Sequence, residues 1–263
     1  MQRARAHAEI VALVEATGMP CATLTMGRTA LDEHHPAHVG VYDGRMSCPV
    51  GVKELVESSD CLICVGAVWS DYNTGGFTAK LEQGHIVDIK LRHTVVKKAR
   101  FDDIRSVDVL RALAKHIRHR SGAEAAYWSP RAPGNNIIAA PPAPPGSPVH
   151  SDAFLSELQR LLSPGDLLLT ETFTLTFAAI EMRIPSGVTF ITQALWGSIG
   201  FATPAAGGAV RALAKHATED ATCPGRRVVL VTGDGSLQMT AAALADMLRD
   251  KLAPLIFVIN NDG

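Results

Sequence analysis

The sequence predicts an α/β protein with two doubly wound parallel-sheet domains. Three observations support this: apolar runs that suit strands buried on both faces, segments of helical period between them, and a proline-rich stretch that divides the chain. With 263 residues, of which 47% are apolar and 19% charged, the chain is long enough to form two folded cores. We therefore expect one domain on each side of the proline-rich stretch.

The first domain is expected to span residues 1–117. Its predicted elements are, in order, a helix at 3–16, a strand at 21–26, a helix at 52–58, strands at 61–68 and 85–91, and a helix at 106–117. Such alternation is typical of a parallel sheet covered by helices on both sides. The arginine-bearing first helix also resembles a transit peptide, but a surface helix is the interpretation that we favour.

The stretch between the two domains is expected to be a linker over residues 118–149. It holds seven prolines, at positions 130, 133, 141, 142, 144, 145 and 148. Proline lacks the backbone N–H that helices and central strands need, so this composition favours an extended connection.

The second domain is expected to span residues 150–263. Its predicted elements are a helix from 151, strands at 166–172 and 188–193, a small-residue helix at 199–215, a strand at 226–236, a helix at 238–250 and a strand at 253–261. The sequence stops directly after the last strand with no closing helix. We therefore expect this domain to be truncated at its C-terminus.

Composition excludes several kinds of partner. The net charge is −1, so no overall field attracts nucleic acid, and no apolar run approaches the ~20 residues of a membrane span. Cys61 and Cys64 form a C-x-x-C inside a predicted buried strand, where residues three apart point to opposite faces. We interpret the pair as structural, and the five scattered cysteines predict a reducing, cytoplasmic location.

The last 38 residues carry the strongest chemical signal. They predict a strand, a glycine turn, a helix and a second strand, which a right-handed crossover makes parallel to the first. Asp234 and Asn261 would then meet at the carboxyl edge of the sheet, where open α/β sheets bind ligands. With the backbone carbonyl of Gly263 they offer three oxygens, which suits Mg²⁺ held partly by substrate phosphates.

The turn between this strand and helix predicts an anion site. Gly233 and Gly235 would let the backbone turn tightly and approach an anion closely. The N–H groups of Gly235 and Ser236 would then face a phosphate at the start of the helix.

Two motifs reveal a family resemblance. Gly-Asp-Gly at 233–235, 24 residues at 236–259, and then Asn-Asn resembles the diphosphate-binding motif of thiamine-diphosphate-dependent enzymes. "LWGSIG" at 195–200 resembles the corresponding segment of pyruvate and indolepyruvate decarboxylases, a family of 2-oxo acid decarboxylases. The resemblance implies thiamine diphosphate and Mg²⁺ as cofactors.

The resemblance also implies roles for single residues. The carbonyl of Gly197 would accept a hydrogen bond from the cofactor's amino group, and Ile199 would support the bent cofactor from below. Thr172 and Thr174, in "TETFT", match two threonines that contact cofactor and substrate. Phe173 stands where pyruvate-specific members carry a small residue, which leaves the size of the substrate pocket open.

The first domain resembles the middle domain of the same decarboxylases, apparently without its first strand. It has no phosphate-binding glycine pattern, so no second cofactor is expected. The pair His34-His35 looks like the family's catalytic histidines, but those belong to an N-terminal domain, and a surface or packing role is favoured here. Because the family's proton-transfer residues fall outside this sequence, no catalytic residue is assigned, and we expect this chain alone to be inactive.

The implied function is non-oxidative decarboxylation of a small 2-oxo acid, of the pyruvate, indolepyruvate or phenylpyruvate type, to an aldehyde and CO₂. Members of the family form homodimers or homotetramers with active sites between subunits. The main alternative is a non-catalytic module that binds thiamine diphosphate and Mg²⁺ or only oligomerises. An acetolactate-synthase-like carboligase is a further alternative, against which "LWGSIGF" argues.

Overall fold

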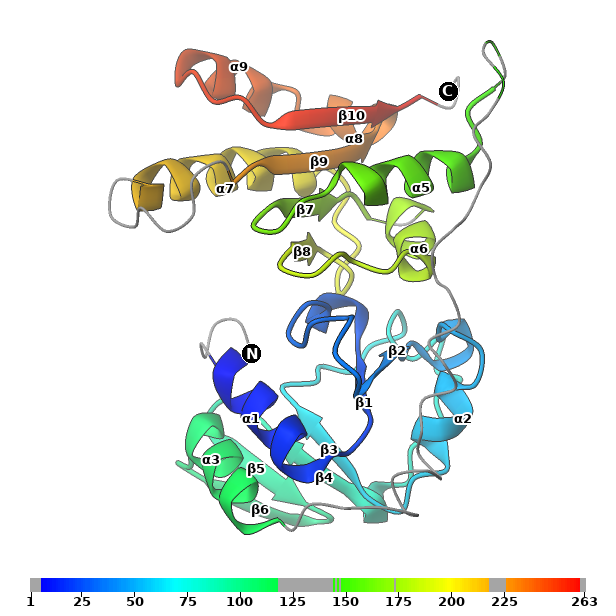
Figure 1. The fold of residues 1–263 in the computed structure, drawn as a ribbon, viewed down its shortest axis with the longest axis vertical. Coiled ribbons are helices and arrows are strands. Elements are labelled where there is room, and N and C mark those ends of the chain that lie inside the picture. The colour runs from blue at the N-terminus through cyan, green and yellow to red at the C-terminus, as the bar shows by residue number, and fades with distance from the viewer. Residues whose placement is uncertain are drawn as a thin grey trace. The chain divides into compact units, whose positions relative to one another are not determined.

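The computed structural model describes residues 6–117, 144, 146, 148–172, 174–217 and 226–260. The chain forms two compact units, Met1–Asn135 and Asn136–Gly263 (Figure 1). Each unit combines helices with a β-sheet, so the predicted α/β class is confirmed. None of the helices in the described part of the chain is both long and apolar enough to cross a membrane.

The second unit contains a four-stranded parallel sheet in the order β10-β9-β7-β8. Its elements are α5 (Ser151–Leu161), β7 (Leu167–Thr170), α6 (Thr174–Glu181), β8 (Thr189–Thr192), α7 (Ala202–Ala217), β9 (Val228–Gly233), α8 (Asp234–Met239), α9 (Ala242–Arg249) and β10 (Leu255–Ile259). The four strands match the four predicted ones. Helix α6 is not among the predicted elements. The single helix expected at 238–250 is instead two helices, the first of which starts at Asp234.

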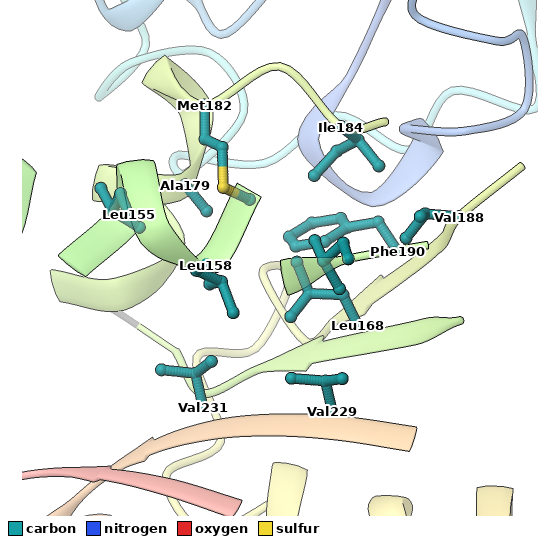
Figure 2. Close-up of a cluster of buried hydrophobic side chains, with 11 residues drawn as sticks. Leu155, Leu158, Leu168, Ala179, Met182, Ile184, Val188, Phe190, Val229 and Val231 are labelled. Carbon is teal, nitrogen blue, oxygen red and sulfur yellow. The ribbon is translucent and has the colours of Figure 1, made fainter. Parts of the chain in front are cut away.

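This sheet is apolar on both faces, and helices cover each face. On β9, Val229 and Val231 point into a cluster lined by α5 and α6, shown in Figure 2. Their neighbours Val228 and Leu230 point into a second cluster under α7 and α9. Because successive side chains of a strand alternate between faces, one uninterrupted apolar run supplies both cores. The doubly wound architecture predicted for this unit is therefore confirmed.

The first unit has two sheets, a two-stranded parallel one and a four-stranded mixed one, and the mixed sheet corrects the all-parallel prediction. Its elements are α1 (His7–Thr17), β1 (Cys21–Thr23), β2 (His38–Val41), α2 (Val52–Glu57), β3 (Leu62–Val65), β4 (Ile86–Ile89), β5 (His93–Val96), β6 (Ala99–Asp102) and α3 (Ser106–His116), with short 3₁₀ turns η2 (Thr25–Gly27), η3 (Gly44–Met46) and η4 (Gln83–His85). Strands β1 and β2 pair in parallel, as do β3 and β4. Strands β5 and β6 extend the second sheet in the antiparallel sense.

The β5–β6 hairpin has a simple physical origin. Two residues, Lys97 and Lys98, connect the strands, and Lys97 takes the left-handed conformation (φ 56°) that such short hairpin loops use. A parallel pair would instead need a long crossover. All four residues of β6 are exposed, so this strand has no buried face and leaves no apolar pattern in the sequence.

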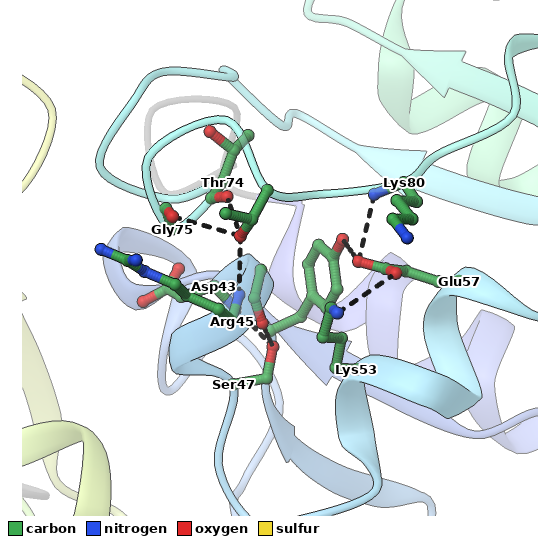
Figure 3. A network of polar contacts seen from close by, with 11 residues as sticks. Asp43, Arg45, Ser47, Lys53, Glu57, Thr74, Gly75 and Lys80 are labelled. Atoms are coloured by element: carbon green, nitrogen blue, oxygen red, sulfur yellow. Dashed lines mark hydrogen bonds and ion pairs between the residues drawn. The ribbon is translucent and has the colours of Figure 1, made fainter.

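Two loops of the first unit pack tightly against each other. The backbone N–H of Arg45 donates to the hydroxyl of Thr78 (3.0 Å), and that hydroxyl donates to the carbonyl of Gly75 (3.1 Å), as Figure 3 shows. Nearby, Glu57 of α2 accepts hydrogen bonds from the hydroxyl of Tyr42 and the backbone N–H of Lys80. These bonds hold the segment after β2 and the segment before β4 together.

Asp43 is a buried carboxyl group in this network, with 1% of its surface exposed. One of its oxygens accepts a hydrogen bond from the hydroxyl of Thr25, and the other has no partner among the described residues. Burial raises the pKa of Asp43 to about 6, although the bond from Thr25 and the positive charge of Arg28 act in the opposite direction. The carboxyl therefore holds its proton more tightly in the folded state than in the unfolded state.

Asp43→Asn is expected to remove a pH dependence of stability. A raised folded-state pKa contributes stability that is complete below the unfolded value of 3.8 and is lost as the pH rises through about 6. For this group the loss between pH 4 and pH 7 amounts to about 2 kcal/mol. Urea unfolding of both proteins across this range measures the difference between their stability curves. Parallel curves would contradict the prediction.

The cysteine pair and the histidine pair of the first unit each have an ordinary structural environment. Cys61 precedes β3 and is exposed, which corrects its predicted place within a buried strand, whereas Cys64 lies on β3. Both thiols are free, and burial raises the pKa of Cys64 to about 11, so it is no reactive thiolate. His34 and His35 sit in a turn, where Nδ1 of His35 accepts a hydrogen bond from the N–H of Ala37 (3.1 Å).

Candidate cofactor-binding site

The carboxyl ends of the four parallel strands meet along one edge of the second unit's sheet. In the register of β9 and β10, Gly233 pairs with Ile259, so the residues that follow them, Asp234 and Asn260, leave neighbouring strands at the same level. On β7, Thr170 pairs with Val231 of β9. The segments after β7, β9 and β10 therefore share the edge that the sequence predicts as the ligand site. Asn261 and Gly263, the other predicted metal ligands, lie outside the described residues.

Asp234 is placed where a metal ligand is expected. It is the first residue of α8, directly after β9, and its side chain is only partly buried. Within the described part of the chain its carboxylate takes part in no hydrogen bond or ion pair. No described side chain therefore occupies this carboxylate at the sheet edge.

The glycines around Asp234 provide space rather than an unusual backbone. Gly233 has φ −83° and ψ 160°, which is extended geometry open to any residue. A Cβ atom added to Gly235 would meet nothing within 4 Å. The backbone around Gly235 and the partly buried Ser236 therefore remains approachable by a ligand.

The segment with Gly197 and Ile199 packs against the end of α8. The hydroxyl of Thr240, which follows α8, donates to the carbonyl of Gly200 (2.9 Å). A Cβ atom on Gly200, whose φ is +87°, would lie 3.0 Å from the Cβ of Met239. The structure thus places the predicted ring-binding segment against the C-terminal end of α8, the helix whose first residue is Asp234. Ile199 remains 51% exposed, so its side chain can contact a ligand.

Two threonines follow β7 at the same edge. Thr172 is 7% exposed, and its hydroxyl has no hydrogen-bond partner among the described residues. Thr174 is exposed at the first position of α6, and Phe173 between them lies outside the described residues. A buried hydroxyl without a partner is costly unless a water or ligand bonds to it, so Thr172 marks a position where a polar partner is expected.

These features fit a diphosphate bound through a divalent cation. No three His, Cys, Asp or Glu side chains gather as a metal cage anywhere in the described ranges. A single carboxylate completed by amide, carbonyl and phosphate oxygens is the usual arrangement for Mg²⁺. In such an arrangement Asp234 would supply the carboxylate, the open surface at Gly235 would leave room for phosphate, and the half-exposed Ile199 would offer an apolar contact.

Two family models match the chain. The thiamine pyrophosphate enzyme central domain matches residues 1–117, and the thiamine pyrophosphate enzyme C-terminal TPP binding domain matches residues 172–263. The chain belongs to the thiamine pyrophosphate enzyme family. Thiamine diphosphate with Mg²⁺ is accordingly the cofactor that this family implies, and the matched C-terminal range contains the edge described above.

Within the thiamine pyrophosphate enzymes, the chain is similar to several pyruvate decarboxylases. The chain is 36% identical to a pyruvate decarboxylase of Aspergillus fumigatus over 255 residues, which cover 97% of the chain and 42% of that protein. It is 37% identical to pyruvate decarboxylase isozyme 1 of Saccharomyces cerevisiae and to a putative pyruvate decarboxylase of Schizosaccharomyces pombe, each covered over 44% of its length. The chain thus spans less than half the length of these relatives.

Two polar residues at the candidate site of this thiamine pyrophosphate enzyme were not selected from the sequence, and the structure reveals them. Glu171 is a buried carboxylate between the strand end of β7 and Thr172. Its only signal in the sequence is a charge directly after the apolar run "LLLT". Thr240 carried no signal, because its partner Gly200 lies 40 positions away in the sequence.

Thr240→Val is expected to loosen the segment that carries Gly197 and Ile199. Valine keeps the shape of threonine but removes the bond to Gly200, so the unit should lose about 1 kcal/mol of stability. Thr189→Val, at an exposed position of β8, is the matched control and should lose far less. Urea unfolding measures both variants, and equal losses would show that the bond to Gly200 has no special weight.

Proposed function

We propose that the second unit binds thiamine diphosphate through Mg²⁺, and that the whole protein decarboxylates a 2-oxo acid without oxidation. The products would be an aldehyde and CO₂. Thiamine diphosphate, when bound, supplies an electron sink for the carbon–carbon bond that breaks. The observation that carries the proposal is the carboxylate of Asp234, which has no partner among the described residues, at the edge where β7, β9 and β10 end.

The proposal assigns the predicted residues at the metal and the phosphates as follows. Asp234, the side-chain amide of Asn261 and the carbonyl of Gly263 would ligate the metal ion. The backbone N–H groups of Gly235 and Ser236 would bind phosphate oxygens. This division suits Mg²⁺, which prefers few protein ligands and retains phosphate and water oxygens.

The remaining residues would orient the ring end of the cofactor. The carbonyl of Gly197 would accept a hydrogen bond, and the half-exposed side chain of Ile199 would form the apolar support. The unpartnered hydroxyl of Thr172 would meet the cofactor or the substrate, and Thr174 would contribute beside it. Support for these roles comes from the packing of the Gly197 segment on the end of α8.

Calorimetry with this chain tests the binding part of the proposal. Thiamine diphosphate is titrated into the protein with Mg²⁺ and, separately, with a chelator. We expect binding that depends on Mg²⁺, because the metal joins the protein carboxylate to the phosphates. No binding under either condition would overturn the assigned cofactor site.

A carbon dioxide assay tests the catalytic part. Pyruvate, phenylpyruvate, indolepyruvate and branched-chain 2-oxo acids are each supplied with thiamine diphosphate and Mg²⁺, and CO₂ release is measured for the whole protein. Release from at least one acid supports decarboxylation. Tight binding without release from any acid would instead favour a non-catalytic cofactor-binding module.

Assembly is a further part of the proposal. The family resemblance implies homodimers or homotetramers whose active sites lie between subunits, and we propose the same for the whole protein. Sedimentation equilibrium with and without thiamine diphosphate and Mg²⁺ measures this directly. A monomer in both conditions would contradict a shared site.

A further inference from the structure

The side chain of Glu171 bridges two segments of the candidate site. The residue is buried, with 1% of its surface exposed, and follows the last residue of β7. One carboxylate oxygen accepts a hydrogen bond from the N–H of Thr172 (3.0 Å). The other accepts one from the N–H of Ala202 (3.3 Å), the first residue of α7. A single carboxylate thus joins the end of β7 to the start of α7.

The backbone of Glu171 is fixed as well. Its N–H donates to the carbonyl of Val231 on β9 (2.9 Å), and its carbonyl accepts from the hydroxyl of Thr176 on α6 (2.7 Å). The carboxylate therefore extends from a backbone that two other elements hold in place. The carboxylate thus offers the N–H of Ala202 an acceptor whose own backbone is held in place.

The two bridged segments are the ones that the proposed cofactor contacts. Thr172 carries the buried hydroxyl that has no partner among the described residues. Ala202 follows the segment 197–201, which contains Gly197 and Ile199. Thr203, next to Ala202, has a second buried hydroxyl without a partner among the described residues. Of these two hydroxyls, which lack partners among the described residues, one is on a residue whose N–H Glu171 binds and the other is on the residue after Ala202.

We propose that Glu171 is a positioning residue for the cofactor site. Its carboxylate locks the Thr172 segment to the start of α7 and so sets the spacing between them, without contacting the cofactor itself. The negative charge also suits the N-terminus of the 16-residue helix α7. The part of this inference that concerns the cofactor rests on the proposed function.

The bridge requires two acceptors, which makes the choice of variant informative. Glu171→Gln replaces one acceptor oxygen by an NH₂ group, so one of the two backbone N–H groups must face another donor. Glu171→Asp keeps both oxygens on a shorter stem that cannot reach as far. If the glutamine variant fails to fold, the aspartate variant tests the same bridge.

Asp166→Asn is the matched control at the opposite end of β7. Asp166 is also 1% exposed, and its carboxylate also accepts backbone N–H groups, from Ser163 (2.9 Å) and Arg227 (3.2 Å). Its loss should weaken the same sheet far from the proposed cofactor. A purely structural role for Glu171 would make the two variants behave alike.

The first measurement is hydrogen exchange of the cofactor-free chain, resolved by peptide. In Glu171→Gln we expect the amides of Thr172 and Ala202 to exchange roughly tenfold faster. In Asp166→Asn the increase should fall near Ser163 and Arg227 instead. Unchanged exchange at both Thr172 and Ala202 in the glutamine variant would overturn the proposal.

The second measurement is calorimetry with thiamine diphosphate and Mg²⁺. Glu171→Gln should bind roughly tenfold more weakly than the unaltered chain, whereas Asp166→Asn should stay within about twofold. Equal weakening in both variants would reduce Glu171 to a stabilising residue. If the unaltered chain binds no cofactor but exchange changes as expected, the proposed cofactor site fails while the bridge by Glu171 stands.

Discussion

Asp234→Ala is expected to weaken the Mg²⁺-dependent binding of thiamine diphosphate by about 100-fold, because the described edge of the sheet offers the metal this one unengaged carboxylate. The variant should keep its fold, since the Asp234 side chain makes no hydrogen bond within the described residues. Calorimetry measures the affinity, and circular dichroism checks the fold.

The matched control is Asp246→Ala on α9. Asp246 is exposed and pairs with Arg249 one turn later, so its loss should change neither affinity nor stability appreciably. If Asp234→Ala binds thiamine diphosphate as tightly as the control does, the carboxylate is not a metal ligand. The diphosphate site would then need to be sought elsewhere.

Gly44→Ala is expected to cost the first unit about 3–5 kcal/mol of stability, because the new methyl group would overlap a neighbouring backbone. A Cβ atom at Gly44 would lie 2.2 Å from the carbonyl oxygen of Thr74, in the network of Figure 3. Gly44 also has φ +57°, which disfavours alanine. Urea unfolding measures the loss.

Gly76→Ala separates the steric overlap from the backbone strain. Gly76 has φ +73°, similar to that of Gly44, but a Cβ atom there would meet nothing within 4 Å. Only the backbone strain remains, so the expected cost is about 1–2 kcal/mol. If both variants lose the same stability, the contact between the segments of Gly44 and Thr74 is not tightly packed.

Several elements could be predicted from sequence because local pattern and tertiary role agree. Strand β9 is an apolar run of β-branched and aliphatic residues, and it lies at the centre of the second unit's core. The Gly-Asp-Gly turn after it predicted the edge to which Asp234 belongs. In these cases burial on both faces leaves a direct trace in composition.

Other features left no such trace. Helix α6 reads "TLTFAAIE", in which two β-branched threonines and a nearly all-apolar composition hide the helical period. Strand β6 is exposed throughout and shows no alternation. The bridge from Glu171 to Ala202 joins positions 31 apart, and no spacing rule links a carboxylate to a backbone N–H at that distance.

The two-sided burial of β9 bears on how its register is specified. A shift by one residue would exchange Val229 and Val231 with Val228 and Leu230, and both cores would still receive aliphatic side chains. Hydrophobicity alone therefore fixes the strand only weakly. Arg227, which precedes the apolar run, limits the ambiguity, because a shift in one direction would place its charge at the buried position of Val228.

Slippage of β9 would also carry Asp234 about 3.3 Å along the edge, the rise of one residue in a strand. A metal site tolerates far smaller displacements of its ligands. The placement of Asp234 therefore depends on the register of β9. In this unit the charged residue at the start of the strand, rather than its interchangeable aliphatic core, specifies that register.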